Sequence, residues 1–173
     1  MSAKDRTVTA SLRINEAAYR ALQDDAKKQN ISLNTIANQI LMAYAEHDRY
    51  LKKYRMIKIA GPTFARILNF TPDEGLAEAG RLEGTGIIPS VVVSIAGELS
   101  VSSILEGLKR MGTYSSLFDY SEVSHGGKIS VTLAHDLGPK GSILAASFLE
   151  SLFRSIGKQI KVTQLRDSVA FEV

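Results

Sequence analysis

The sequence predicts an α+β protein with two parts, a small N-terminal module and a larger domain that combines helices with an antiparallel sheet. Apolar and polar residues alternate strictly over residues 7–14, as in a strand with one buried face. Several later segments repeat apolar residues at helical spacing. Two pairs of strand-like segments near the end are joined by turn residues, at 125–127 and at 166–167.

The composition is that of a folded, soluble protein. Of 173 residues, 45% are hydrophobic and 23% are charged. No apolar run reaches the roughly 20 residues that a membrane span needs, and the N-terminus lacks the apolar core of a signal peptide. The chain has no cysteine, which excludes disulfides and thiolate metal sites. We therefore expect a cytoplasmic protein that does not contact a membrane.

Positive charge is concentrated in the first third of the chain. Residues 1–55 contain ten Lys and Arg against six Asp and Glu, whereas residues 56–173 contain eleven against twelve. A basic segment joined to a neutral domain is typical of proteins that bind nucleic acid through one part.

The N-terminal module, residues 1–55, is predicted as a strand over residues 7–14 followed by two helices. Asn15 is a helix N-cap with Glu16 behind it, and Asn30 can close that helix in the left-handed conformation. Ser32 is a second N-cap, and the apolar stripe behind it continues to Tyr44. The polar residues after it predict a connector helix that emerges into solvent near residue 54.

The order of strand, short helix, turn and longer helix resembles the ribbon–helix–helix family of prokaryotic regulators, the class of Arc, MetJ and CopG. The resemblance rests on residues 8–16, on Leu22 and Ala26, on Asn30-Ile31-Ser32 and on residues 36–44. It covers residues 7 to about 50, and Asn30 stands where family members often have glycine. It implies an intertwined homodimer with a two-stranded antiparallel ribbon, and a sequence-specific transcriptional regulator that binds double-stranded DNA.

The strand residues also argue for a dimer on physical grounds. A lone strand followed by two helices leaves its backbone groups unpaired and its apolar face poorly covered, and a second copy of the chain would supply both. The ribbon would then present its polar face to the major groove, with base contacts from Thr9, Ser11 and Arg13. Phosphate contacts would come from the start of the second helix and from preceding basic residues: Ser32, Leu33, Asn34, Lys4 and Arg6.

Residues 56–173 are predicted as an α+β domain for ligand sensing or oligomerisation. Strands are expected at 56–60, 91–96, 117–124, 128–136, 160–164 and 168–173, and helices at 62–70, from 71 to about 84–86, at 100–112 and at 141–156. Aromatic and aliphatic residues suit either a core or an interface that joins dimers into a tetramer: Tyr114, Leu117, Phe118, Tyr120 and Phe153.

The stretch 135–142 links a strand to a helix through two glycines and carries four residues that are candidates for a small-molecule or anion site: His135, Asp136, Lys140 and Ser142. An ordinary turn before a capped helix is the simpler interpretation. His47, His125 and His135 lack the close paired spacing of a metal motif, so no metal and no other cofactor is expected.

Two other functions compete with transcriptional regulation. The same N-terminal fold occurs in antitoxins and other protein-interaction or assembly proteins, but these usually carry a flexible tail, whereas residues 56–173 have regular secondary-structure signals. An enzyme is not expected, because the sequence has no cysteine nucleophile, no Gly-x-Ser-x-Gly motif and no paired metal histidines.

Overall fold

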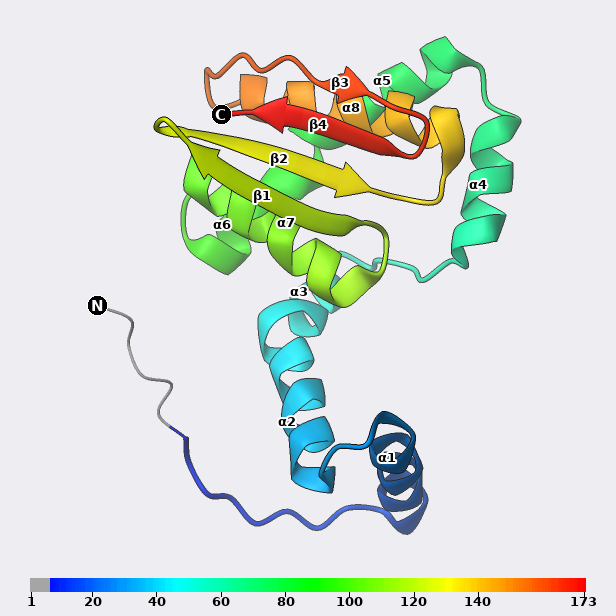
Figure 1. Cartoon of the computed structure of the whole chain (residues 1–173), viewed down its shortest axis with the longest axis vertical. Helices are drawn as coiled ribbons and strands as arrows, with labels where there is room; N and C mark the ends of the chain where they lie inside the picture. The colour runs from blue at the N-terminus through cyan, green and yellow to red at the C-terminus, as the bar shows by residue number, and fades with distance from the viewer. Residues whose placement is uncertain (1–6) are drawn as a thin grey trace. The chain divides into compact units, whose positions relative to one another are not determined.

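The computed structural model describes residues 7–173 and divides into two compact units, residues 1–42 and 43–173. Each unit is considered by itself. The helix expected to connect the two predicted domains, residues 44–54, belongs to the second compact unit (Figure 1).

The first unit contains helix α1 (Glu16–Gln29) and helix α2 (Leu33–Ala43). As predicted, Asn15 caps α1, where its side chain accepts a hydrogen bond from the Ala17 amide at 2.9 Å. Asn30 ends the helix in the left-handed conformation with φ 55°. The Ser32 hydroxyl accepts from the Thr35 amide at 3.0 Å and caps α2. Local side-chain chemistry therefore fixes both helix starts and the turn between them.

The predicted strand at residues 7–14 is wrong. These residues belong to neither a helix nor a strand. The regular elements in the described part of the first 50 residues are all helices, and the sheet lies within residues 119–172. The resemblance to the ribbon–helix–helix family is therefore overturned. The alternation fixes which side chains share a side of an extended chain, but a strand also needs a hydrogen-bonded neighbour. Within the described residues, the backbone of 7–14 forms no hydrogen bond.

The second unit begins with a π-helix (Tyr44–Asp48) and helix α3 (Arg49–Lys53). The expectation that this segment emerges into solvent holds for Arg49, Lys52 and Lys53, which are exposed, but it is wrong for His47. His47 is 5% exposed and packs on Tyr114, whose hydroxyl donates a 2.7 Å hydrogen bond to Glu46 and thereby has a raised pKa. The Tyr54 hydroxyl lies 2.7 Å from that of Ser94. These contacts anchor the segment to the rest of its unit.

The remaining helices are α4 (Gly61–Asn69), α5 (Asp73–Thr85), α6 (Ile87–Ala96), α7 (Val101–Ser115) and α8 (Gly138–Arg154). Two glycines of α5 bring it unusually close to α8. A Cβ on Gly80 would lie 2.5 Å from the Leu144 carbonyl oxygen, and one on Gly84 would lie 2.6 Å from that of Phe148. The absence of side chains at these positions allows the two backbones to touch.

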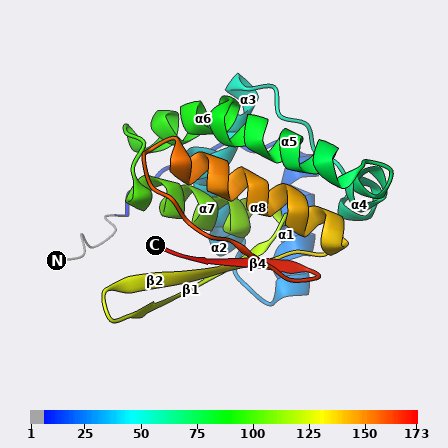
Figure 2. The ribbon, with the colours of Figure 1, turned by 90° about the horizontal axis from the view of Figure 1, so that it is seen from above.

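A four-stranded antiparallel sheet, in the order β1-β2-β4-β3, closes the unit: β1 (Asp119–His125), β2 (Lys128–Ala134), β3 (Thr163–Gln164) and β4 (Ser168–Glu172). The predicted hairpin turn is confirmed, with positive φ at Gly126 and Gly127. Figure 2 shows α8 between the sheet and α5. The core contains side chains from one face of the sheet and from two helices: Val131, Leu133, Val169, Phe171, Ile104, Leu105, Leu108, Leu149, Leu152 and Phe153.

Two other predicted strands are wrong. Residues 91–96 belong to helix α6, where Val91 and Val92 are buried, and residues 56–60 have no regular structure. The β-branched residues favoured a strand by propensity, but Gly97 closes a helix with φ 84° and the apolar side chains find neighbours on α7. The α+β class and the other predicted helices and strands are confirmed within a few residues.

Among the described residues no single helix is long and apolar enough to cross a membrane. Two consecutive segments, Asp73–Ala96 and Val101–Ser115, are together long and apolar enough for a membrane span, but the chain bends by 97° between them.

The contact between α5 and α8 gives a stability prediction. Gly84→Ala places a methyl group against the backbone of α8, so we expect it to lower the free energy of unfolding by about 1–3 kcal/mol. Gly61→Ala is the control, because nothing lies within 4 Å of its added Cβ. Urea unfolding of both variants measures the difference, and equal stability would show that the helices can move apart without cost.

Candidate functional site

The residues predicted to contact bases lie together before α1. Thr9, Ser11 and Arg13 are all exposed, and within the described part of the chain none of their side chains forms a hydrogen bond or ion pair. They occupy alternate positions of an extended segment, so their side chains are available to a ligand. These three side chains are thus exposed, but the strand that was expected to carry them is absent from the described residues.

The predicted phosphate contacts are only partly described. Lys4 and Arg6 lie outside the described residues. The Ser32 hydroxyl caps α2 and also lies 2.8 Å from the Thr35 hydroxyl, so its side chain already has partners within the helix. Leu33 is half-buried and Asn34 is exposed. The first-turn amides of Leu33 and Asn34 have no carbonyl partner inside a helix, as at any helix start.

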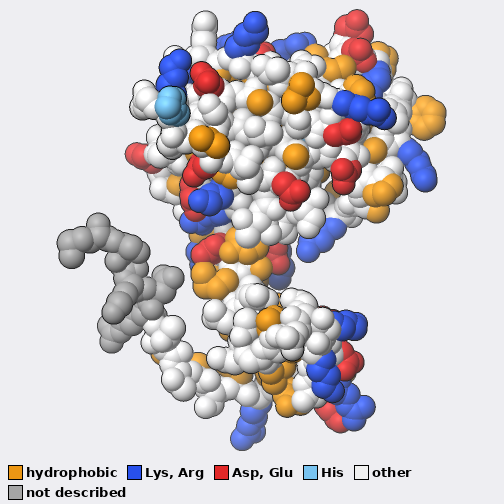
Figure 3. All heavy atoms as spheres, in the orientation of Figure 1, with side chains coloured by type: hydrophobic (Ala, Val, Ile, Leu, Met, Phe, Trp, Pro, Cys, Tyr) orange, Lys and Arg blue, Asp and Glu red, His pale blue; other side chains and the backbone are white. Residues whose placement is uncertain are grey.

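The apolar residues of the first unit are largely uncovered. Within its described residues only Ala26 and Ile36 are buried hydrophobics. Seven large apolar side chains are exposed, and orange side chains reach the surface of this unit in Figure 3: Val8, Leu12, Ile14, Tyr19, Ile40, Leu41 and Met42. Two buried side chains are too few to hold a helix pair and an extended segment together in water. Val8, Leu12 and Ile14 were expected on the buried face of a strand, whereas the structure leaves them exposed.

The stretch 135–142 forms a hydrogen-bonded turn. His135 is 7% exposed, and its Nδ1 accepts from the Leu137 amide at 3.2 Å. Its Nε2 therefore carries the proton and donates to the Ser142 hydroxyl at 3.2 Å, which in turn donates to the Leu165 carbonyl at 2.6 Å. This chain of donors and acceptors fixes the neutral imidazole in one tautomer. Burial lowers the pKa of His135, an effect opposed by nearby Asp167 and Asp136.

The four candidate residues of this stretch do not converge on one ligand position. His135 and Ser142 are bonded to each other, whereas Asp136 is exposed. The Lys140 amine donates to the Thr71 carbonyl at 2.8 Å and to the Asp73 carboxylate, which joins the start of α8 to the start of α5. The geometry of the stretch is that of a βα turn with satisfied polar groups. The described residues contain no group of three or more His, Cys, Asp or Glu that could hold a metal ion.

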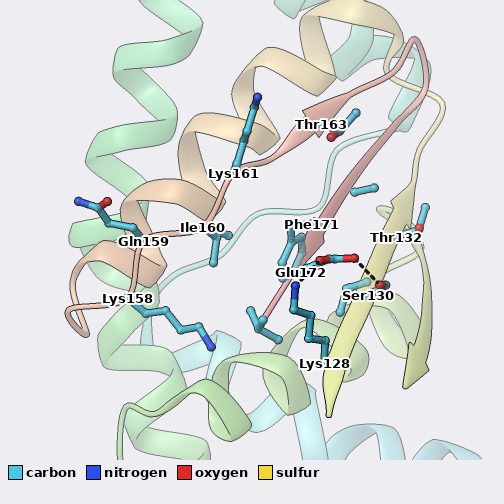
Figure 4. A pocket seen from close by; sticks show the side chains of 13 residues that line it. Lys128, Ser130, Thr132, Lys158, Gln159, Ile160, Lys161, Thr163, Phe171 and Glu172 are labelled. Atoms are coloured by element: carbon cyan, nitrogen blue, oxygen red, sulfur yellow. Dashed lines mark hydrogen bonds and ion pairs between the residues drawn. The ribbon is translucent and has the colours of Figure 1, made fainter. Parts of the chain in front are cut away.

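A broad hollow of about 620 Å³ lies on the outer face of the sheet (Figure 4). The Lys128 amine lies 3.5 Å from Glu172, which also accepts a hydrogen bond from Ser130. In Figure 4 the Lys161 amine points away from the amines of Lys128 and Lys158, so the three lysines do not surround a common point. This hollow therefore lacks the convergent charges of an anion site.

A different cavity is lined almost wholly by apolar side chains and was not anticipated from the sequence. It has a volume of about 200 Å³ and lies among helices α4–α8 and strand β2, where it is lined by Ile88, Met111, Leu133, Leu144 and Phe148, with further residues. No sequence motif marks it, because its residues come from distant segments. Of the aromatic residues considered for an interface, Phe153 is fully buried in the core, and Phe118 and Tyr120 pack against that core.

The His135 network gives a pH prediction. Since burial lowers the pKa of folded His135, the unfolded chain takes up a proton below about pH 6.5 more readily than the folded chain. His135 therefore makes stability fall as the pH drops through that region. Unfolding of His135→Gln, which cannot titrate, should depend less on pH between 7 and 5 than unfolding of the wild type.

His125→Gln is the matched control, because His125 is exposed in the hairpin. It should keep the pH dependence of the wild type. If both variants retained the full dependence, other groups would be responsible and the assignment to His135 would be wrong.

No protein-family model, curated protein or solved structure matches this chain. Function is therefore inferred from the geometry of this chain alone.

Proposed function

We propose that the protein is a DNA-binding transcriptional regulator that acts as a homodimer through its N-terminal unit. The observation that carries the proposal is the composition of the two sides of the segment 7–14. Val8, Leu12 and Ile14 are exposed apolar side chains, and Thr9 and Arg13 alternate with them as exposed polar side chains. One side is suited to a protein contact and the other to a polar ligand.

The dimer is inferred from the small core that the described residues of the first unit form. Exposed apolar side chains from the segment and from α2 would cover each other between two copies, and burial of each large side chain contributes roughly 1.5–3 kcal/mol. A second copy is the simplest partner, because a two-fold axis supplies the same surface to both sides. The dimer would also double the polar side of the segment.

DNA suits that doubled polar side. Arg13 can donate two hydrogen bonds to a guanine, while Thr9 and Ser11 can donate to or accept from base edges. The excess of basic residues in 1–55 favours attraction to phosphates, to which the first turn of α2 can add amide donors. A dimer reads two half-sites, so a near-palindromic operator is expected.

The second unit favours regulation over the alternative of an antitoxin-like interaction protein. It has its own core, built from two helices and one face of a sheet, rather than the flexible tail of a partner-binding protein. Its role would be to sense a ligand or to join dimers into tetramers. A partner protein that covers the apolar side of the segment remains the runner-up, and the oligomeric state distinguishes the two.

A DNA selection experiment tests readout by Arg13. Duplexes selected from a random pool by the wild-type protein should bind Arg13→Ala more weakly, by about 1–3 kcal/mol, with relaxed sequence preference. Arg20→Ala is the matched control, since Arg20 is an exposed arginine paired with Glu16 on α1. Anisotropy titrations at roughly 0.15 M salt measure both variants.

Two results would count against this assignment. If Arg13→Ala and Arg20→Ala lost the same DNA affinity, both arginines would contribute only general electrostatic attraction and Arg13 would not read bases. If the selection enriched no duplex, the proposed sequence-specific DNA binding would be wrong.

A second experiment tests the dimer independently of DNA. Leu12→Asp places a charge on the apolar side of the segment, so we expect it to shift the protein from dimer to monomer in sedimentation velocity. Ser11→Asp introduces the same charge at the adjacent polar position and should remain dimeric. Dimers of both variants would show that the segment lies outside the interface.

A further inference from the structure

We infer that the second unit binds a neutral, linear hydrocarbon chain in the apolar cavity among helices α4–α8 and strand β2. This inference concerns ligand binding by residues 43–173 and does not depend on DNA binding. The cavity has a volume of about 200 Å³, and its lining includes Phe64, Met111, Leu144 and Phe148. His135 and Glu83 are its only lining residues with ionisable side chains.

The cavity lies where two apolar clusters of the unit meet. Phe64, Leu137 and Leu144 belong to a small cluster formed by α4, α5 and the start of α8. Leu133 and Phe148 belong to the main core or pack against it. The two clusters leave a space between them that protein side chains do not fill. An apolar ligand would complete the packing and connect both clusters.

The polar groups near the cavity indicate that the buried part of the ligand forms no hydrogen bond. Both ring nitrogens of His135 are engaged, by the Leu137 amide and by Ser142. Among the described residues, no buried side-chain nitrogen or oxygen lacks a hydrogen-bond partner. A ligand hydroxyl or carboxylate placed inside would lose its hydration without replacement. Glu83 is an exposed residue, and its carboxylate disfavours an anionic head group beside it.

The volume sets the size of the occupant. An apolar cavity of about 150 Å³ stays dry and accepts benzene, which has six carbon atoms, so one of about 200 Å³ accepts roughly eight carbon atoms by the same ratio. A second cavity of about 220 Å³ lies on the other side of the same residues, because Ile88, Met111, Leu117 and Phe148 line both. Movement of these shared side chains would let a longer chain pass from one cavity into the next. A linear molecule therefore fits the pair better than a broad ring system.

The four methionines of the chain provide a direct readout. Met111 lines both cavities and Met56 lines the second, whereas Met42 belongs to the first unit. We would label the methionine methyl groups of the full-length protein with ¹³C and titrate it with 1-decanol. We expect a saturable shift of the Met111 signal and no shift of the Met42 signal. The control ligand 1,10-decanediol has the same length but a second hydroxyl, and should bind at least about tenfold more weakly.

Two variants in which leucine replaces an alanine then locate the bound ligand. Ala145→Leu fills the first cavity from α8 and should weaken 1-decanol binding about tenfold or more. Ala134→Leu makes the same change at an exposed position of β2 that lines neither apolar cavity, and should bind as the wild type does. Thermal unfolding without ligand verifies that both variants are folded. The comparison of alcohol with diol uses wild-type protein, so it tests the inference even if Ala145→Leu fails to fold.

The inference is overturned by any of three results. These are an unshifted Met111 signal up to the solubility limit of 1-decanol, equal affinity for the alcohol and the diol, and unchanged binding by a folded Ala145→Leu. Tighter binding of decanoate than of 1-decanol would contradict a neutral ligand and indicate a fatty acid instead. DNA binding measured on the same samples would be unaffected by these outcomes, so the two proposals fail separately.

Discussion

The second unit depends on the burial of one face of its sheet. Alternate residues of β2 and β4 point inward, and Val131, Leu133, Val169 and Phe171 are almost completely buried beneath α7 and α8. The intervening residues, such as Ser130 and Glu172, remain on the outer face. Because α8 is covered by the sheet on one side and by α5 on the other, it is the element through which the layers are joined (Figure 2). The glycines of α5 let its backbone approach that of α8 closely.

The same packing explains the apolar cavity. The sheet and α7 form one cluster around α8, while α4 and α5 form another at its N-terminal end. Gly141, near the start of α8, has His135 and Leu137 as neighbours, and the hydrogen bonds of His135 hold this turn in place. Polar bonds thus fix the edge of the cavity while apolar side chains form its wall. A hydrogen-bonded polar edge beside an incompletely filled apolar space suits a ligand site that discriminates by polarity.

Sequence reasoning succeeded where the determinants are local. Asn15, Asn30 and Ser32 act through atoms a few residues away, and the paired glycines at 126–127 determine their own turn. It failed where the outcome depends on distant partners. Residues 7–14 have the pattern of a strand without a strand beside them, and the valines of α6 are held in a helix by their neighbours. The apolar cavity could not be predicted, since residues as distant in sequence as Phe64 and Phe148 form it together.

The proposed function rests on the dimer, because the described residues of the N-terminal unit expose more large apolar side chains than they bury. The most direct test is the number of chains bound per duplex, measured by sedimentation of the wild-type protein with a selected DNA at varied mixing ratios. We predict two chains on each short duplex, or four if dimers associate, and no complex with a single chain. A complex that contains one chain per duplex would contradict the proposed dimer.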